Sequence, residues 1–181
     1  MEQNVAKRVP YGIQDFVQVI EQNCYYVDKT AYIPKLEDCP NNLFCIRPRR
    51  FGKSVFLSML HAYYDCRTKD KFQEWFGDLW IGKHPTPLQG RYQVMHLDFS
   101  QVGGSIENLE EKFNFYLGVQ LNGFIRDYLD FYSEKVQKQV EDAKDAGVKL
   151  AIIQSEARSK GYPLYLIIDE YDNFTNTVLN E

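Results

Sequence analysis

A Gly-Lys-Ser step, placed between an apolar run and an amphipathic segment, is the feature that most constrains how this chain folds. The step lies in IRPRRFGKSVFLSML, residues 46–60, and the apolar run before it, 43–47, has no helical period, which predicts a buried strand. After the step, apolar side chains recur on one face of a predicted helix over 53–65. They are Val55, Phe56, Met59, Leu60 and Tyr63. The sequence therefore predicts a strand, a basic loop and a helix in direct succession.

The start of that helix has the composition of a phosphate-binding loop. Free N–H groups and the helix dipole favour an anion at a helix N-terminus. Gly52 lets the backbone approach a phosphate without a Cβ, Lys53 supplies a positive charge, and Ser54 offers its hydroxyl to Mg²⁺. The predicted nucleotide-binding residues are Arg49, Arg50, Phe51, Gly52, Lys53, Ser54 and Val55.

The loop departs from the usual pattern G-x-x-x-x-G-K-[ST] at the first glycine, where Arg47 stands. Arginine adopts a positive φ only at a cost, so the loop entry is expected to differ from the usual one. Arg49 and Arg50 have two interpretations: they steer phosphate or bind an acidic partner, or they belong to a solvated basic turn. A Gly-Lys-Ser step alone is a weak motif.

A second motif, Asp169-Glu170 after the apolar run LYLII at 164–168, strengthens the nucleotide interpretation. In such a pair the aspartate holds Mg²⁺ and the glutamate polarises the attacking water. The competing interpretation is a strand that ends in two solvated acids. The two motifs are less expected together by chance, so Asp169 and Ser54 are predicted as metal ligands. Glu170 and Lys53 are predicted as catalytic residues.

The remaining pattern alternates strands with helices, which predicts an α/β fold with a mainly parallel sheet. Expected strands lie at 24–27 and 92–100, and expected helices lie at about 105–128, at 134–146 with Gly147 as its C′ residue, and at 149–159. Asp98 ends one strand, where it either faces the site or is solvated. The stretch 28–30 (Asp-Lys-Thr) either caps a helix, the favoured interpretation, or packs near the nucleotide.

The net charge and the composition limit the classes of partner that the sequence supports. The formal net charge is -4, so a broad nucleic-acid surface is not supported, although a local basic patch stays possible. No signal peptide or membrane span is visible, which predicts a soluble cytoplasmic protein without a membrane partner. The four cysteines and three histidines have no metal-ligand spacing.

Four stretches together resemble the predicted AAA-ATPase-like family common in Bacteroidetes, whose members often carry a PD-(D/E)XK nuclease-like domain downstream. They are YYVDKTAYIPKL, IRPRRFGKSVFLSML, VMHLDFS and LYLIIDEYDNF, in the order of the family. Arg47 at the first glycine position is itself a family habit. The resemblance implies an AAA-like, ASCE-type P-loop three-layer sandwich that takes ATP and Mg²⁺. It places Lys53 and Ser54 at the phosphates, and Asp169 and Glu170 in metal binding and hydrolysis.

The resemblance also implies a sheet order like 5-1-4-3-2, in which the fourth strand lies between the strand at 43–47 and the strand at 164–168. We therefore expect one domain over 1–181, with a lead-in at 1–40 and the P-loop region through the Asp-Glu motif at 41–181. We expect no segment of 1–181 to correspond to the sensor, arginine-finger or lid regions of the family. The sheet is expected to be incomplete at its C-terminal side, and the chain to be a truncated form with little activity alone.

Three function classes stay open from the sequence. The first is an ATPase in the complete protein, and the second is a nucleotide-binding switch or scaffold with little turnover, which Arg47 favours. The third is a nucleic-acid-associated module that uses Arg47, Arg49 and Arg50 against backbone phosphate, which the acidic total opposes.

Overall fold

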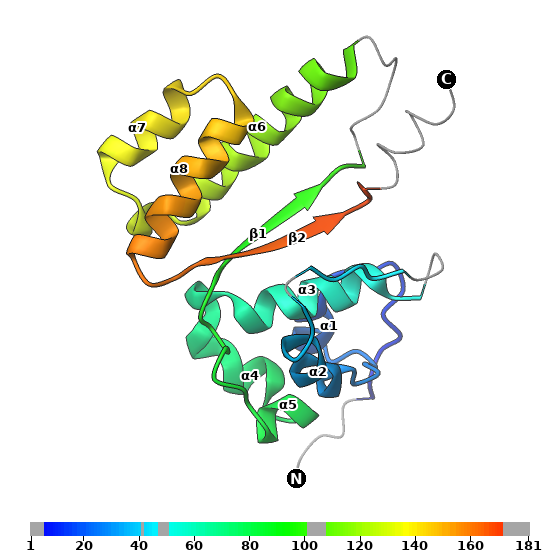
Figure 1. The fold of residues 1–181 in the computed structure, drawn as a ribbon. Coiled ribbons are helices and arrows are strands. Elements are labelled where there is room, and N and C mark those ends of the chain that lie inside the picture. The colour runs from blue at the N-terminus through cyan, green and yellow to red at the C-terminus, as the bar shows by residue number, and fades with distance from the viewer. Residues whose placement is uncertain (1–5, 41, 47–50, 101–107, 172–181) are drawn as a thin grey trace. The chain divides into compact units, whose positions relative to one another are not determined.

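The computed structural model describes residues 6–40, 42–46, 51–100 and 108–171. The chain divides into two units, Met1–Gly90 and Arg91–Glu181, and each has its own set of packed elements (Figure 1). The mixture of helices with a parallel pair of strands confirms the α/β prediction.

The first unit is helical. Its elements are α1 (Phe16–Glu21), the 3₁₀ turn η1 (Thr30–Tyr32), α2 (Ile33–Glu37), α3 (Lys53–Tyr64), η2 (Cys66–Lys71), α4 (Phe72–Phe76) and α5 (Trp80–Lys83). The bounds of α3 confirm the helix predicted over 53–65.

One carboxylate fixes α1 against α3. Asp15 caps α1, because its Oδ1 accepts a hydrogen bond from the backbone N–H of Gln18 at 2.8 Å. Its Oδ2 accepts from the Ser58 hydroxyl of α3, also at 2.8 Å. The same Ser58 Oγ accepts from the backbone N–H of Phe16 at 2.8 Å. These bonds set the position of the N-terminal segment beside the start of α3.

Aromatic rings fill the space between these helices. Phe16, Tyr63 and Phe76 are fully buried. The ring of Phe76 stacks on that of Phe16 with centroids 4.9 Å apart and meets that of Tyr63 edge-on at 5.6 Å. The high aromatic content of the chain thus serves the core of this unit.

The second unit contains the sheet. Its elements are β1 (Gln93–Asp98), α6 (Leu109–Asp127), η4 (Leu129–Phe131), α7 (Glu134–Asp142), α8 (Ala146–Ser159) and β2 (Leu164–Asp169). The strands pair in parallel, with Gln93 opposite Leu164 and Asp98 opposite Asp169. The strands predicted at 92–100 and 164–168 are confirmed, and they pair directly. The order 5-1-4-3-2 stays a prediction.

Polar bonds tie the helices of this unit to one another and to the sheet. The Tyr128 hydroxyl accepts from the backbone N–H of Val94 at 2.8 Å, and the Tyr132 hydroxyl donates to Gln93 Oε1 at 2.6 Å. Lys149 of α8 is buried, and its ammonium donates to Asn122 Oδ1 on α6 and to the carbonyl of Val140 in the last turn of α7. A buried cation at a helix C-terminus is stabilised by the free carbonyls there.

The strand predicted at 43–47 is wrong for residues 43–46, and Arg47 lies outside the described residues. Residues 43–46 have no regular structure, and Phe44 and Ile46 are 79% and 85% exposed. An apolar run forms a buried strand only where a neighbouring strand accepts its hydrogen bonds. Within the described residues, β1 and β2 pair with each other alone. The strand expected at 24–27 is likewise reduced to one bridge, between Arg8 and Cys24.

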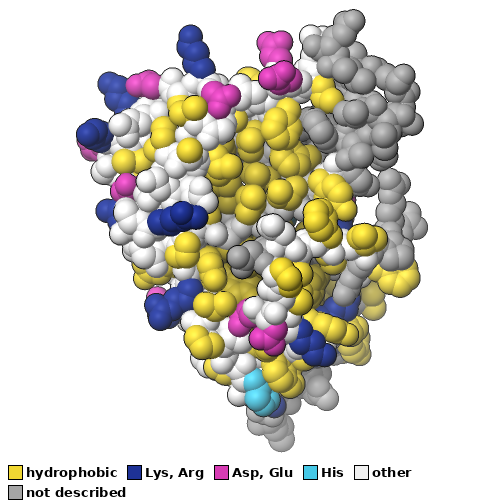
Figure 2. Space-filling view, in the orientation of Figure 1, with side chains coloured by type: hydrophobic (Ala, Val, Ile, Leu, Met, Phe, Trp, Pro, Cys, Tyr) yellow, Lys and Arg dark blue, Asp and Glu magenta, His cyan; other side chains and the backbone are white. Residues whose placement is uncertain are grey.

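The expectation that 164–168 is buried holds for only one side of β2. Ile167 is buried, whereas Leu166 and Ile168 are 45% and 43% exposed. Figure 2 shows that hydrophobic side chains gather in the middle of the face drawn there. Among the described helices none is both long and apolar enough to cross a bilayer.

A buried carboxylate in the first unit predicts acid sensitivity. Asp65 is buried, and its carboxylate accepts hydrogen bonds from Arg67 Nη2 at 2.8 Å and from the backbone N–H of Arg67 at 2.9 Å. Burial raises the pKa of Asp65, but His61 and Arg67 outweigh it and lower the pKa to about 2. Since this pKa lies below that of the unfolded chain, the stabilisation is complete above about pH 4 and is lost as pH falls towards 2.

We therefore expect the free energy of unfolding to fall by roughly 2 kcal/mol between pH 4 and pH 2 on account of Asp65. Urea titrations followed by tryptophan fluorescence would measure it, since Trp75 and Trp80 both lie in the first unit. The Asp65→Asn variant is less stable at pH 7, and its deficit relative to the wild type should shrink as the pH falls. Parallel curves for the two proteins would contradict this assignment.

Candidate functional site

The Gly-Lys-Ser step lies where the sequence places it, at the first turn of α3. Gly52 has φ 74° and ψ 30°, in the left-handed region that favours glycine, and its carbonyl accepts from the backbone N–H of Phe56 at 3.0 Å. Lys53, Ser54 and Val55 form the first turn and are partly buried. This turn presents N–H groups and the positive end of a 12-residue helix.

The basic side chains before the step lie outside the described residues. Arg47, Arg49 and Arg50 are among them, so their roles and the choice between phosphate steering and a solvated turn stay predictions. Phe51, the first described residue after this stretch, has an exposed ring.

A lysine distant in sequence reaches the same turn. A Cβ atom on Gly52 would lie only 3.6 Å from Lys29 Nζ. Lys29 is partly buried, and within the described part of the chain its ammonium has no hydrogen bond or ion pair. It therefore places a positive charge next to the start of α3.

The neighbours of Lys29 hold it in place. Asp28 Oδ1 accepts from the backbone N–H of Thr30 at 2.8 Å and from its hydroxyl at 2.7 Å, and Asp28 Oδ2 accepts from the backbone N–H of Trp80 at 2.7 Å. The buried Thr30 hydroxyl accepts in turn from the N–H of Ile81 at 3.1 Å. The capping interpretation of 28–30 holds only in part: Lys29, which precedes η1, makes no side-chain cap bond, but Asp28 accepts from the first N–H of η1 and from that of α5. The side chain of Lys29 lies near Gly52 instead.

The acidic pair closes β2 in the second unit. Asp169 is buried, and its Oδ1 accepts from the backbone N–H of Glu170 at 2.9 Å. Glu170 has φ 54°, which is uncommon for a residue other than glycine. Such backbone strain is often found at functional positions, where the surroundings enforce it. No pattern in the sequence predicts this conformation of Glu170.

Asp98 ends β1 directly opposite Asp169 in the register. Its side chain is exposed and accepts from the backbone N–H of Ser100 at 2.8 Å. Gln120 of α6 fixes the backbone there, since its Oε1 accepts from the N–H of Asp98 at 2.9 Å. Two carboxylate residues therefore end neighbouring parallel strands at the same edge.

The metal assignment combines residues of the two units. Lys53 and Ser54 belong to the first unit, and Asp169 and Glu170 belong to the second. Their meeting in one cleft therefore stays a prediction, as does the shared Mg²⁺ site of Ser54 and Asp169. In the part of the chain that the structure describes, no three His, Cys, Asp or Glu side chains cluster as a metal site.

Residues 10–181 match the AAA-ATPase-like family, described as "Predicted AAA-ATPase". Because the match covers nearly the whole sequence, the chain belongs to this family. This confirms the family resemblance seen in the sequence.

The chain is similar to an uncharacterized protein in the vnfD 5′ region of Azotobacter chroococcum mcd 1, with 27% identity over 172 residues. The match covers 92% of this chain and 29% of that relative, so the chain spans less than a third of its length. The comparison with solved structures gives no match.

Proposed function

We propose that this chain is the nucleotide-binding part of an ATPase and binds MgATP at the first turn of α3. The observation that carries the proposal is Gly52 in the left-handed conformation immediately before Lys53-Ser54, with a second lysine beside it. Membership of the predicted AAA-ATPase family supports the same ligand. The corresponding fold is an AAA-like P-loop sandwich, to which β1 and β2 contribute two neighbouring parallel strands.

The residues present suit a magnesium nucleotide. The N–H groups of the α3 start and the ammonium of Lys53 are donors for phosphate oxygens. Carboxylate and hydroxyl oxygens are the donors that Mg²⁺ takes, and Asp169 and Ser54 offer them. When bound, Mg²⁺ neutralises charge on the β- and γ-phosphates.

In the proposed reaction, water attacks the γ-phosphorus and the bond to the β–γ bridging oxygen breaks, which yields ADP and phosphate. Glu170 accepts a hydrogen bond from the water and takes its proton as the new P–O bond forms. Lys53 holds the γ-phosphate in line. A role for Glu170 at this point is compatible with its strained backbone at the end of β2.

A second candidate is a nucleotide-binding switch with little turnover. Arg47 at the first glycine position of the loop favours it, because the loop entry then differs from that of efficient ATPases. Binding of MgATP without phosphate release would select this candidate. A nuclease-like partner domain and a nucleic-acid ligand stay predictions of the sequence.

Lys53→Ala is expected to weaken MgATP binding by about 1.5–3 kcal/mol, the contribution of a hydrogen bond to a charged group. Calorimetric titration of the wild type and the variant would measure the loss. Lys83→Ala is the matched control, because Lys83 is an exposed lysine of the same unit on α5. Equal affinity of the wild type and Lys53→Ala would refute the site.

A further inference from the structure

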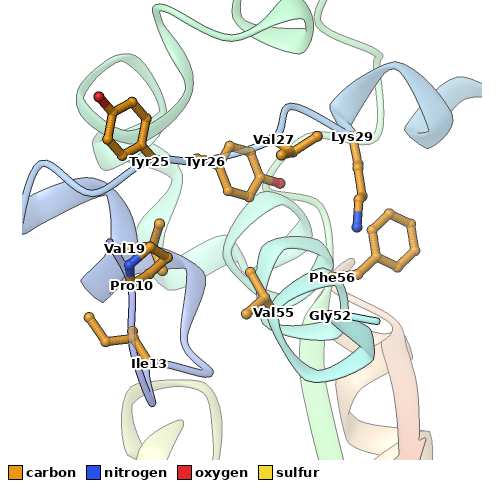
Figure 3. Close-up of a pocket in the computed structure, with 10 residues that line it drawn as sticks. All are labelled: Pro10, Ile13, Val19, Tyr25, Tyr26, Val27, Lys29, Gly52, Val55 and Phe56. Atoms are coloured by element: carbon orange, nitrogen blue, oxygen red, sulfur yellow. The ribbon is translucent and has the colours of Figure 1, made fainter. Parts of the chain in front are cut away.

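An apolar pocket lies directly beside Gly52 within the first unit (Figure 3). Its volume is ≈ 190 Å³ and it is open on one side. One wall comes from the N-terminal segment, with Ile13, Tyr26 and Val27, and the other comes from the start of α3, with Gly52, Val55 and Phe56. The bonds of Asp15 and Phe16 to Ser58 hold the two walls together.

A buried hydroxyl in this wall lacks a partner. The Tyr26 oxygen is shielded from solvent and makes no hydrogen bond of good geometry to any described residue. Burial, and after it the carboxylate of Asp28, raise the pKa of Tyr26, while the backbone N–H of Lys29 lowers it. The hydroxyl therefore stays protonated at neutral pH. Because its oxygen is shielded from solvent, Tyr26 lines the open pocket with its ring and not with its hydroxyl.

Lys29 stands at the Gly52 end of the same pocket. In Figure 3 its side chain extends from the N-terminal segment towards α3, next to the ring of Phe56. Its ammonium lies close to Gly52, and within the described residues it has no hydrogen bond or ion pair. The pocket is therefore apolar along its walls and positively charged at the end where the phosphate loop begins.

We propose that the segment 10–29 forms the second half of the nucleotide site, with the pocket holding the base and Lys29 contacting the phosphates beside Gly52. This inference rests on the proposed binding of ATP at α3. A flat aromatic base suits walls of Tyr26, Val27 and Phe56, because stacking and apolar contact need no particular polar pattern. A second lysine at the phosphates adds a charge-assisted hydrogen bond to that of Lys53.

The test separates the two ends of the nucleotide. The full chain is titrated calorimetrically with MgATP and with magnesium tripolyphosphate, which lacks base and ribose. Lys29→Met should weaken both ligands by roughly tenfold to a hundredfold, as loss of a hydrogen bond to a charged group predicts. Ile13→Trp fills the pocket, so it should weaken MgATP by about tenfold or more and leave tripolyphosphate unchanged. Lys83→Ala, the exposed control, should bind both ligands as the wild type does.

The outcomes distinguish this inference from the proposed function. If Lys53→Ala weakens MgATP while Lys29→Met and Ile13→Trp bind both ligands normally, the inference is overturned and the phosphate site stands. If the wild type binds neither ligand, the proposed function fails, and the inference fails with it. Lys29→Arg keeps the charge and should retain most of the affinity, whereas a merely structural lysine would give no such rescue.

A second measurement needs no variant and is unaffected by misfolding. The wild-type chain is irradiated with 8-azido-ATP, which carries its reactive group on the base, and the labelled peptides are identified by mass spectrometry. Labels within 10–29 or 52–56 that excess ATP suppresses would support the base pocket. Suppressible labels confined to other peptides would overturn it.

Discussion

Glu170→Gln is expected to lower the rate of phosphate release by roughly 100- to 10,000-fold, the usual contribution of a general base. Glutamine has nearly the same shape as glutamate but does not take a proton from water. The substitution should not add backbone strain, because glutamine, like glutamate, has a Cβ and pays the same cost for the left-handed φ of 54°. Binding of MgATP should therefore be unchanged, since only the transition-state contribution is removed.

Two quantities are measured for the wild type and the variant: the steady-state rate of phosphate release and the calorimetric affinity for MgATP. Both are measured in a form of the protein that hydrolyses ATP. Glu134→Gln is the control, because Glu134 is an exposed acid at the start of α7 and should have wild-type turnover. Asp169→Asn should instead reduce the Mg²⁺ dependence of binding. Unchanged phosphate release in Glu170→Gln would remove Glu170 from the mechanism and would favour the switch.

Local patterns in the sequence predicted a helix or strand correctly where the structure of that segment depends mainly on its own residues. The apolar period of α3 and α6 and the strand formers of β1 and β2 define these elements without help from distant residues. The helix start after Gly52 followed for the same reason, because the glycine stands directly before the amphipathic segment. Local reasoning failed at Gly147, which was expected after a helix and instead lies in the first turn of α8. Asp145 caps α8 by accepting from the N–H of Val148, and this cap moves the boundary.

Distant contacts account for the other differences. Residues 43–46 are apolar, but burial depends on a neighbouring strand that the run itself does not specify. The approach of Lys29 to Gly52 depends on how the segment 10–29 docks on α3, through Asp15 and Ser58. No spacing within the sequence records that docking. The tyrosine pair at 25–26 does not indicate a pocket wall in the sequence. In the structure Tyr26 is half-buried with its oxygen shielded from solvent, and Tyr25 is exposed.

Phe76→Ala is expected to lower the free energy of unfolding of the first unit by about 3–5 kcal/mol. Phe76 is fully buried, and its ring stacks on those of Phe16 and Phe72 at 4.9 and 5.7 Å and meets that of Tyr63 edge-on at 5.6 Å. Alanine would leave a cavity between α1, α3 and α4, and the rings around it would relax only in part. Domains are stable by about 5–15 kcal/mol, so this loss removes a large share of the total.

Urea unfolding followed by tryptophan fluorescence isolates this effect, because both tryptophans belong to the first unit. Phe44→Ala is the matched control in that unit, since Phe44 is 79% exposed and its truncation should change stability by less than about 0.5 kcal/mol. The pair also tests whether residues 43–46 are exposed in solution. A loss of several kcal/mol in Phe44→Ala would mean that residues 43–46 are packed in solution, as the sequence predicts.

The loss of Phe16 packing in Phe76→Ala should also loosen the segment that carries Lys29. Its affinity for MgATP should then fall along with its stability, whereas Phe44→Ala should keep both.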